Sequence, residues 1–367
     1  MNAERLHIIA RAIRDEMKSS NTVTRLKSIS ENLLAQVNDP HNPDYQQAIS
    51  DNLKSLYGAL EKGDSNEFSP AWKQSAIEIG AYDLLGDRLQ SRLQKIFERN
   101  QITPAIANDE VAELLKQVQD LNTAIVRVSR GFERLNIGAE ELKPGECELG
   151  VLVPRGYVKN SLDFFGKELR ELDFIFKTFT EVVTGSRPNL NIRTISSSDL
   201  TIFLDIAPEV AAFMAVAVER VIATYKKILE IRKLRGELKK QDVPENKLGG
   251  IEDHANDLMS DSIEELVVEL MDKSFKSLDA GRSNELKNAL RFALQKIANR
   301  IDNGFNIDIR VEPIPKHNKK AEEESTQSKE RDVHVKTIQD ASKSLQFINP
   351  EGSPILRLPE SEEKQEE

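Results

Sequence analysis

Apolar residues recur at helical spacing along residues 1–142. They fall three or four positions apart, the period that places side chains on one face of an α-helix. The first two series are Leu6, Ile9, Ala10, Ile13 and Met17, followed by Val23, Leu26, Ile29, Leu33 and Val37. Proline interrupts the pattern at Asp39-Pro40 and Ser69-Pro70, where it favours a helix end and a helix start respectively. This half of the chain therefore predicts a helical bundle domain.

The longest apolar series alternates steps of three and four residues without a break. It runs through Val111, Leu114, Val118, Leu121, Ile125, Val128, Phe132 and Leu135. A dimeric coiled coil places charges beside such a seam to set pairing, but the flanking positions here are uncharged: Leu115, Gln117, Asn122, Ala124, Ser129 and Gly131. The pattern favours a core helix of a bundle within the chain, and the alternative is an oligomer interface.

A second pattern begins after Leu142-Lys143-Pro144-Gly145, which we interpret as a domain boundary. Short apolar runs predict strands, and longer periodic runs predict helices. The predicted strands cover residues 147–154, 191–196, 200–206 and 305–311, and the predicted helices cover residues 161–184, 208–241, 253–275 and 283–301. The order β-α-β-β-α-α-α-β predicts a small α+β domain over residues 146–313, with long helices.

The pattern fades over residues 314–367. Residues 316–330 contain almost no apolar side chains, which is typical of disorder. Isolated apolar pairs return at Phe347-Ile348 and Ile355-Leu356, among prolines. We expect a flexible, acidic tail with docking segments within residues 345–358. The predicted fold class is thus mainly α: an N-terminal helical bundle, a small α+β domain with long helices, and a disordered acidic tail.

Composition narrows the class of protein. The 367 residues include 51 Lys and Arg, 61 Asp and Glu, and a single cysteine, Cys147. One cysteine excludes an internal disulfide and a cysteine zinc cluster, and it fits a reducing compartment. No secretory segment and no stretch of about 20 apolar residues is visible. We expect a cytoplasmic protein that does not enter the membrane.

Candidate chemistry is sparse, because the sequence contains no phosphate-binding glycine loop, nucleophile elbow or zinc-binding His-Glu-x-x-His motif. The strongest candidate ligand site is a strand corner of Arg193, Ser196, Ser197, Ser198 and Asp199, where hydroxyls and backbone N–H groups beside an arginine suit an anion. The same residues also form ordinary turns by bonding their own backbone, and we favour that interpretation.

Two further features have simple structural interpretations. The group Glu252, Asp253, His254 and Asp257 resembles a metal site, but acidic residues are also common in the first turn of a helix. Cys147 lies in a predicted strand, where a buried thiol acts as a small apolar residue. We favour these structural interpretations and predict no metal ion, no catalytic residue and no cofactor.

Charge is segregated between two neighbouring helices. Eight basic and two acidic residues lie between Arg220 and Lys240, whereas nine acidic and two basic residues lie between Ile251 and Asp279. An antiparallel hairpin would bring these stretches together, so we expect them to pair within the chain. The alternative is that the basic stretch binds nucleic acid, although its acidic neighbour repels the same phosphates.

Taken together, the sequence predicts a non-enzymatic interaction, adaptor or regulatory subunit of a cytoplasmic multiprotein assembly. Long helical faces and short apolar segments offer contacts to a protein partner or to a second copy of the chain. Two alternatives stay open: an enzyme or sensor of a small anionic ligand at residues 193–199, and a nucleic-acid-associated protein that uses residues 220–240.

Overall fold

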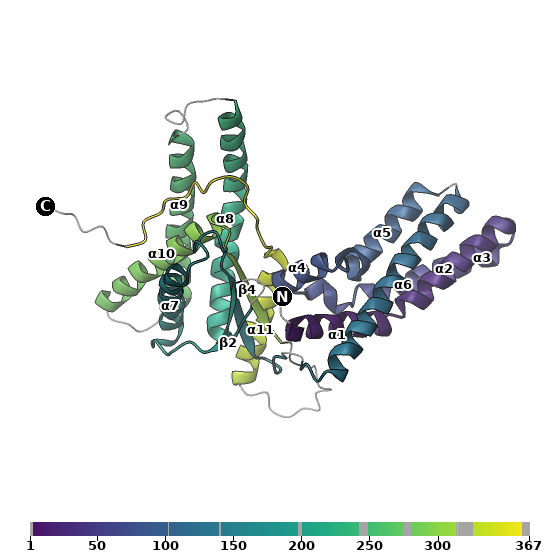
Figure 1. Cartoon of the computed structure of the whole chain (residues 1–367), viewed down its shortest axis with the longest axis horizontal. Helices are drawn as coiled ribbons and strands as arrows, with labels where there is room; N and C mark the ends of the chain where they lie inside the picture. Colours follow the sequence, from purple (N-terminus) through teal and green to yellow (C-terminus); the bar gives the residue numbers. More distant parts are fainter. Residues whose placement is uncertain are drawn as a thin grey trace. The chain divides into compact units, whose positions relative to one another are not determined.

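The computed structural model describes residues 3–101, 103–138, 141–196, 200–241, 249–274, 280–312, 314 and 326–361. The chain is mainly helical and divides into two compact units, Met1–Glu141 and Leu142–Glu367 (Figure 1). The first is a helical bundle and the second combines long helices with a small sheet, which confirms these two parts of the predicted fold class.

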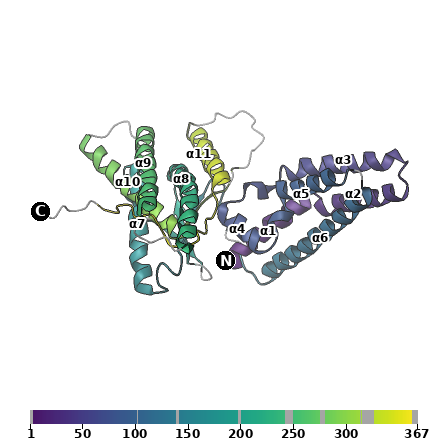
Figure 2. The same ribbon diagram turned by 90° about the horizontal axis from the view of Figure 1, so that it is seen from above.

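The first unit is built from six α-helices and two short 3-10 helices among its described residues. They are α1 (Ala3–Ser19), α2 (Thr22–Asn38), α3 (Pro43–Leu60), η1 (Asp64–Glu67), α4 (Pro70–Glu78), η2 (Tyr82–Leu84), α5 (Gly86–Arg99) and α6 (Pro104–Arg134). Ser69 accepts a hydrogen bond from the Trp72 N–H at 3.4 Å, and Pro70 follows as the first helical residue. This confirms the predicted helix start at Ser69-Pro70. Figure 2 shows α3 returning beside α2.

Helix α6 carries the long apolar series, and its first part packs inside the bundle. Val111, Leu114, Val118 and Ile125 are buried in one apolar core with residues of α1, α2, α3 and α5. Toward the end of the series its residues leave this core: Val128 is 39% exposed, and Leu135, just after the end of the helix, is 71% exposed. The bundle-core interpretation is thus confirmed for the first part, while an oligomer interface at its end stays a prediction.

The second unit contains a four-stranded antiparallel sheet in the order β2-β3-β1-β4. The strands are β1 (Cys147–Leu152), β2 (Ile192–Ile195), β3 (Thr201–Ile206) and β4 (Asn306–Val311). Alternate residues of β1, β3 and β4 belong to the same apolar core as the helices α7 (Leu162–Thr184), α8 (Pro208–Lys240), α9 (Gly249–Ser274) and α10 (Ala280–Asp302). The predicted order of strands and helices is therefore confirmed.

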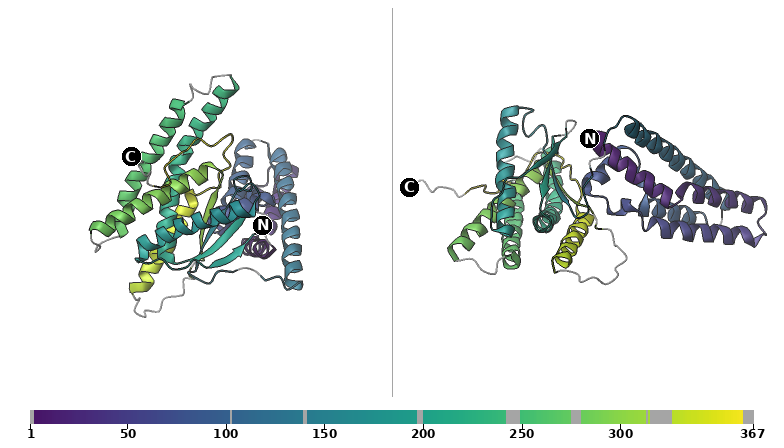
Figure 3. Two further views of the ribbon diagram at one scale, coloured as in Figure 1. Left: turned by 60° about the vertical axis from the view of Figure 1, so that its left-hand side comes forward. Right: turned by 90° about the horizontal axis from the view of Figure 1, so that it is seen from below.

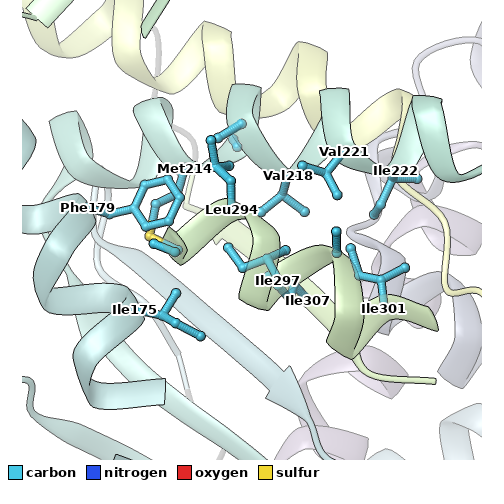
Figure 4. Packing of buried hydrophobic residues seen from close by; sticks show 14 of the residues in the cluster. Ile175, Phe179, Met214, Val218, Val221, Ile222, Leu294, Ile297, Ile301 and Ile307 are labelled. Atoms are coloured by element: carbon cyan, nitrogen blue, oxygen red, sulfur yellow. The ribbon is translucent and has the colours of Figure 1, made fainter. Parts of the chain in front are cut away.

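The long helices supply most of this core. Val218, Val221 and Ile222 of α8 lie against Ile297 and Ile301 of α10, as Figure 4 shows. Helix α9 runs beside α8 as a hairpin, which the left view of Figure 3 displays. The hairpin and α10 create the surface on which the last part of the chain lies.

The prediction of a flexible tail over residues 314–367 needs correction for residues 326–361. These residues form α11 (Thr326–Ser344), which packs on α8 and β4, and then an extended segment across α8 and α9 (Figure 1). We call residues 345–361 the strap. They pack because their aliphatic side chains enter the apolar core of the second unit, which outweighs the entropy of ordering them. The remaining predicted tail, at residues 315–325 and 362–367, lies outside the described residues.

Candidate functional site

The strap lies in a groove of the second unit, held there by apolar side chains. Five of its aliphatic residues are buried in the core: Leu345, Ile348, Ile355, Leu356 and Leu358. Prolines at positions 350, 354 and 359 favour an extended backbone and remove N–H donors that would otherwise need partners. The groove is formed by α8, α9, α10 and the start of β4, and we call it the strap groove.

Three asparagine side chains of the groove bind the strap main chain, each with both its amide oxygen and its amide nitrogen. Asn306 of β4 accepts from the Ile348 N–H at 2.7 Å and donates to the Ile348 carbonyl at 3.2 Å. Asn299 of α10 accepts from the Leu358 N–H at 3.1 Å and donates to the Leu358 carbonyl at 3.0 Å. A side-chain amide has the donor and acceptor of a peptide unit, so each asparagine replaces one neighbouring strand residue.

The third asparagine spans two strap residues. Asn256 of α9 donates to the Ile355 carbonyl at 3.2 Å and accepts from the Arg357 N–H at 2.7 Å. The three asparagines therefore fix the strap near its beginning, middle and end, from three different secondary-structure elements. None of these contacts depends on the identity of a strap side chain.

A buried charged pair fixes the centre of the strap. One carboxylate oxygen of Asp302 accepts from the N–H groups of Ile355 at 2.6 Å and Leu356 at 2.7 Å. The Arg232 guanidinium bonds the other oxygen of Asp302 and also donates to the carbonyls of Glu351, at 2.8 Å, and Gly352. Arg232 is 5% exposed and Asp302 is fully buried, so each charge depends on the other for compensation.

Tyr225 completes this pair. Its hydroxyl donates to Asp302 at 2.7 Å and accepts from Arg232 at 2.9 Å. Burial, together with the adjacent Asp302 carboxylate, raises the pKa of the Tyr225 hydroxyl, so it stays protonated and remains a donor. The strap is thus bound by a network whose members all have hydrogen-bond partners, the arrangement in which buried polar groups are stabilising.

The strap leaves space beside it on two sides. A cavity of about 290 Å³ lies between the strap and the Gly304 turn, and Tyr157 and Pro354 are among its lining residues. A second, of about 400 Å³, lies between α8 and strap residues 346–351, with Lys226 and Lys233 on its wall. Strap residues themselves form part of the wall of both spaces.

The predicted strand corner has an ion-paired arginine. Arg193 of β2 donates to Asp205 of β3 at 2.7 Å and to Glu146 at 3.2 Å, so carboxylates of its own unit neutralise it. Ser196 donates its N–H to the Thr201 carbonyl at 2.8 Å, as in a strand connection. Ser197, Ser198 and Asp199 lie outside the described residues, so anion binding at this corner stays a prediction.

The two other candidate features lie in α9 and in β1. Glu252 forms an ion pair with Arg235 of α8, while His254 and Asp257 are exposed on α9. In the part of the chain that the structure describes, no three His, Cys, Asp or Glu side chains are grouped as metal ligands. Cys147 is buried in β1, and this burial raises the pKa of its thiol to about 12.

The basic and acidic stretches pair in part. Arg220 and Arg235 of α8 bond Glu269, at 3.2 Å, and Glu252 of α9, which confirms the predicted pairing at these positions. The prediction is wrong for Arg232, which bonds Asp302 of α10 and the strap instead. The reason is its place on the inner side of α8, facing the core and not α9.

The asparagines that build the groove were not predicted from the sequence. Asn256, Asn299 and Asn306 stand alone in the sequence, and an isolated asparagine on a helix has no distinguishing pattern. The available signal was in the strap itself, where prolines at positions 350, 354 and 359 bracket the aliphatic residues. Such spacing indicates an extended segment with an apolar contact.

Among the described residues, no helix is long and apolar enough to span a membrane. Comparisons with protein families, with curated proteins and with solved structures found no match to this chain.

Proposed function

We propose that the protein is a non-enzymatic interaction subunit of a cytoplasmic multiprotein assembly, and that its strap groove holds an extended segment of protein. The observation that carries the proposal is the way the strap is bound. Side chains of four elements bond the N–H and carbonyl groups of an extended main chain, while its aliphatic side chains are buried. The single cysteine supports the cytoplasmic part of the proposal.

This mode of binding suits protein partners for a physical reason. Main-chain hydrogen bonds supply affinity for any extended segment, and pockets for alternate side chains supply specificity, as in other forms of extended-peptide recognition. Because the bonds come from side chains, the groove needs no free sheet edge to receive the segment.

The test uses the full chain with the strap weakened by Ile355→Asp and Leu356→Asp, which leaves every groove residue in place. A fluorescent peptide of strap residues 345–361 is titrated against this double variant, and anisotropy reports binding. We expect saturable binding in the micromolar range, about 1–100 μM, because a released groove retains its pockets and its main-chain partners. Adding Asn299→Ala to the same chain should weaken binding about tenfold, since it removes a pair of hydrogen bonds.

Folding of the double variant is checked by circular dichroism. A second variant keeps the wild-type strap, so that misfolding of the double variant does not decide the result. It carries a protease site after Ser344, which is cut once the protein has folded, and the strap can then exchange with the labelled peptide. If both chains retain their helical signal and neither binds the peptide, the proposal is contradicted.

A further inference from the structure

We propose that the strap is an intramolecular competitor for the strap groove, and that the partner it excludes is an extended peptide with two adjacent aliphatic residues, one spacer and a third aliphatic residue. This inference rests on the proposed function, because it specifies the partner and the regulation of the same groove. Its pattern follows the strap residues Ile355, Leu356, Arg357 and Leu358, whose environments differ sharply.

The main-chain contacts make the strap replaceable. Beyond Leu345, the strap residues that the structure describes direct their main-chain hydrogen bonds to side chains of the groove, and not to another main-chain segment. Asn256, Asn299, Asn306 and Asp302 would bond any extended main chain that presents N–H and carbonyl groups at the same spacing. An incoming segment therefore forms hydrogen bonds with the same groove donors and acceptors that lose their partners when the strap leaves.

The side-chain contacts define what that segment must be. Ile355, Leu356 and Leu358 are buried, whereas the Arg357 side chain is 80% exposed. A charged residue at either of the first two positions would be buried beside the Asp302 carboxylate at high cost. The side chain at the spacer position is exposed, so any residue except proline fits there, since the N–H of this position donates to Asn256.

The hydrogen bonds add a second requirement. The N–H groups at positions 355 and 356 both donate to Asp302, so neither position can be proline or an N-methylated residue. Prolines at positions 354 and 359 are compatible, because the strap itself carries them. The partner is thus a segment with aliphatic residues at the three buried positions and free amides, optionally bracketed by prolines.

Linkage within one chain gives the strap its advantage over a partner. A tethered segment has an effective concentration of about 1 mM, so a free peptide of about 10 μM intrinsic affinity binds about 100-fold more weakly while the strap is in place. The closed chain would then respond only to a high local concentration of partner, or to an event that releases the strap.

The experiment compares the wild-type full chain with the Ile355→Asp/Leu356→Asp chain, using the labelled strap peptide. We expect the double variant to bind about 100-fold more tightly than the wild type. Equal affinity for both chains would overturn the competitor role while leaving the proposed function intact. Binding to neither folded chain would overturn the proposed function itself, so the two failures are distinguishable.

Two modified peptides test the partner chemistry on the double variant. An N-methyl group on Leu356 should weaken binding at least tenfold, because it removes one donor to Asp302 and retains the side chain. The same modification at the exposed Ser353 is the matched control and should change little. Equal losses from the two modifications would overturn the assigned hydrogen-bond pattern.

Size-exclusion chromatography with light scattering identifies the occupant of the groove in the wild type. A monomer is expected at all concentrations tested. A dimer that the Ile355→Asp/Leu356→Asp change converts to a monomer would show that the strap of a second copy occupies the groove, and would overturn competition within one chain.

Discussion

The two units use a buried acid in similar ways but for different ends. In the first unit Glu16 accepts from the Ser65 N–H at 2.6 Å, the Ser65 hydroxyl at 2.9 Å and the Gly86 N–H at 3.2 Å. It thereby satisfies main-chain donors at the starts of η1 and α5, which have no partners within their own helices. In the second unit Asp302 also accepts two main-chain N–H groups, but these belong to the strap.

The partners of the two acids explain the difference. The Glu16 donors are neutral, and burial raises the pKa of its carboxyl group above the ordinary value. Asp302 bonds the guanidinium of Arg232, so its charge is compensated. The first acid joins helix ends inside a bundle, whereas the second joins a helical framework to an extended segment. The same device therefore serves folding in one unit and, in our proposal, segment binding in the other.

The largest effect is expected from a charge inside the first unit. Ile125→Asp places a carboxylate in the bundle core, and we expect a loss of about 4 kcal/mol or more in free energy of unfolding, enough to unfold this unit. Val128→Asp, on the exposed side of the same helix, is the control and should cost under about 0.5 kcal/mol. Thermal unfolding followed by circular dichroism measures both.

This pair of variants tests the prediction that the long apolar series of α6 packs in the bundle core. An Ile125→Asp protein that melts like the wild type would show that the middle of the seam is not core, and would favour the oligomer-interface alternative.

In the second unit, Asp302→Ala should lower the free energy of unfolding by nearly as much. It leaves the Arg232 charge buried and removes the acceptor of two strap amides, which corresponds to about 3–5 kcal/mol. Glu269→Ala breaks the more exposed pair with Arg220 and should cost under about 1 kcal/mol. Urea unfolding of the two variants tests the contrast, and equal losses would contradict the central role assigned to Asp302.

This contrast also shows what a sequence can and cannot predict. The bundle was predictable because residues such as Val111 and Val118 repeat with the helical period, and helices with one apolar face must pack together. The strap was not, because Ile348 and Ile355 lie in an extended segment without a period, and their burial depends on a groove from four distant elements. Arg232 was misassigned for a similar reason: charge counting along α8 does not reveal which side of the helix faces the core.

A smaller effect is expected from the pH dependence of the first unit. A carboxyl group whose pKa is raised by folding adds stability below its unfolded pKa, about 4.3, and this stability is lost as pH rises through the folded pKa. The free energy of unfolding of wild type minus that of Glu16→Gln should therefore decrease between pH 4 and pH 7. Urea titrations at several pH values measure it; an increase would mean that the three hydrogen bonds outweigh burial.

The smallest expected effect is on the reactivity of Cys147, whose rate of modification measures how often the sheet of the second unit opens. Because burial raises the pKa of its thiol to about 12, the native protein should react with a thiol reagent at pH 8 only through opening of the sheet. Asp302→Ala should accelerate the reaction strongly, whereas Glu269→Ala should accelerate it less than about fivefold. Rapid modification of the wild type would contradict the buried position of this residue.

Hydrogen exchange at the strap amides tests directly whether the groove binds the strap main chain, because the N–H groups of Ile348, Ile355, Leu356 and Leu358 each donate to a groove side chain. In the wild-type full chain these four amides should exchange slowly, and Asp302→Ala should accelerate those of Ile355 and Leu356 most. Exchange of all four amides at the rate of an unstructured peptide in the wild-type protein would show that the strap is not bound in the groove.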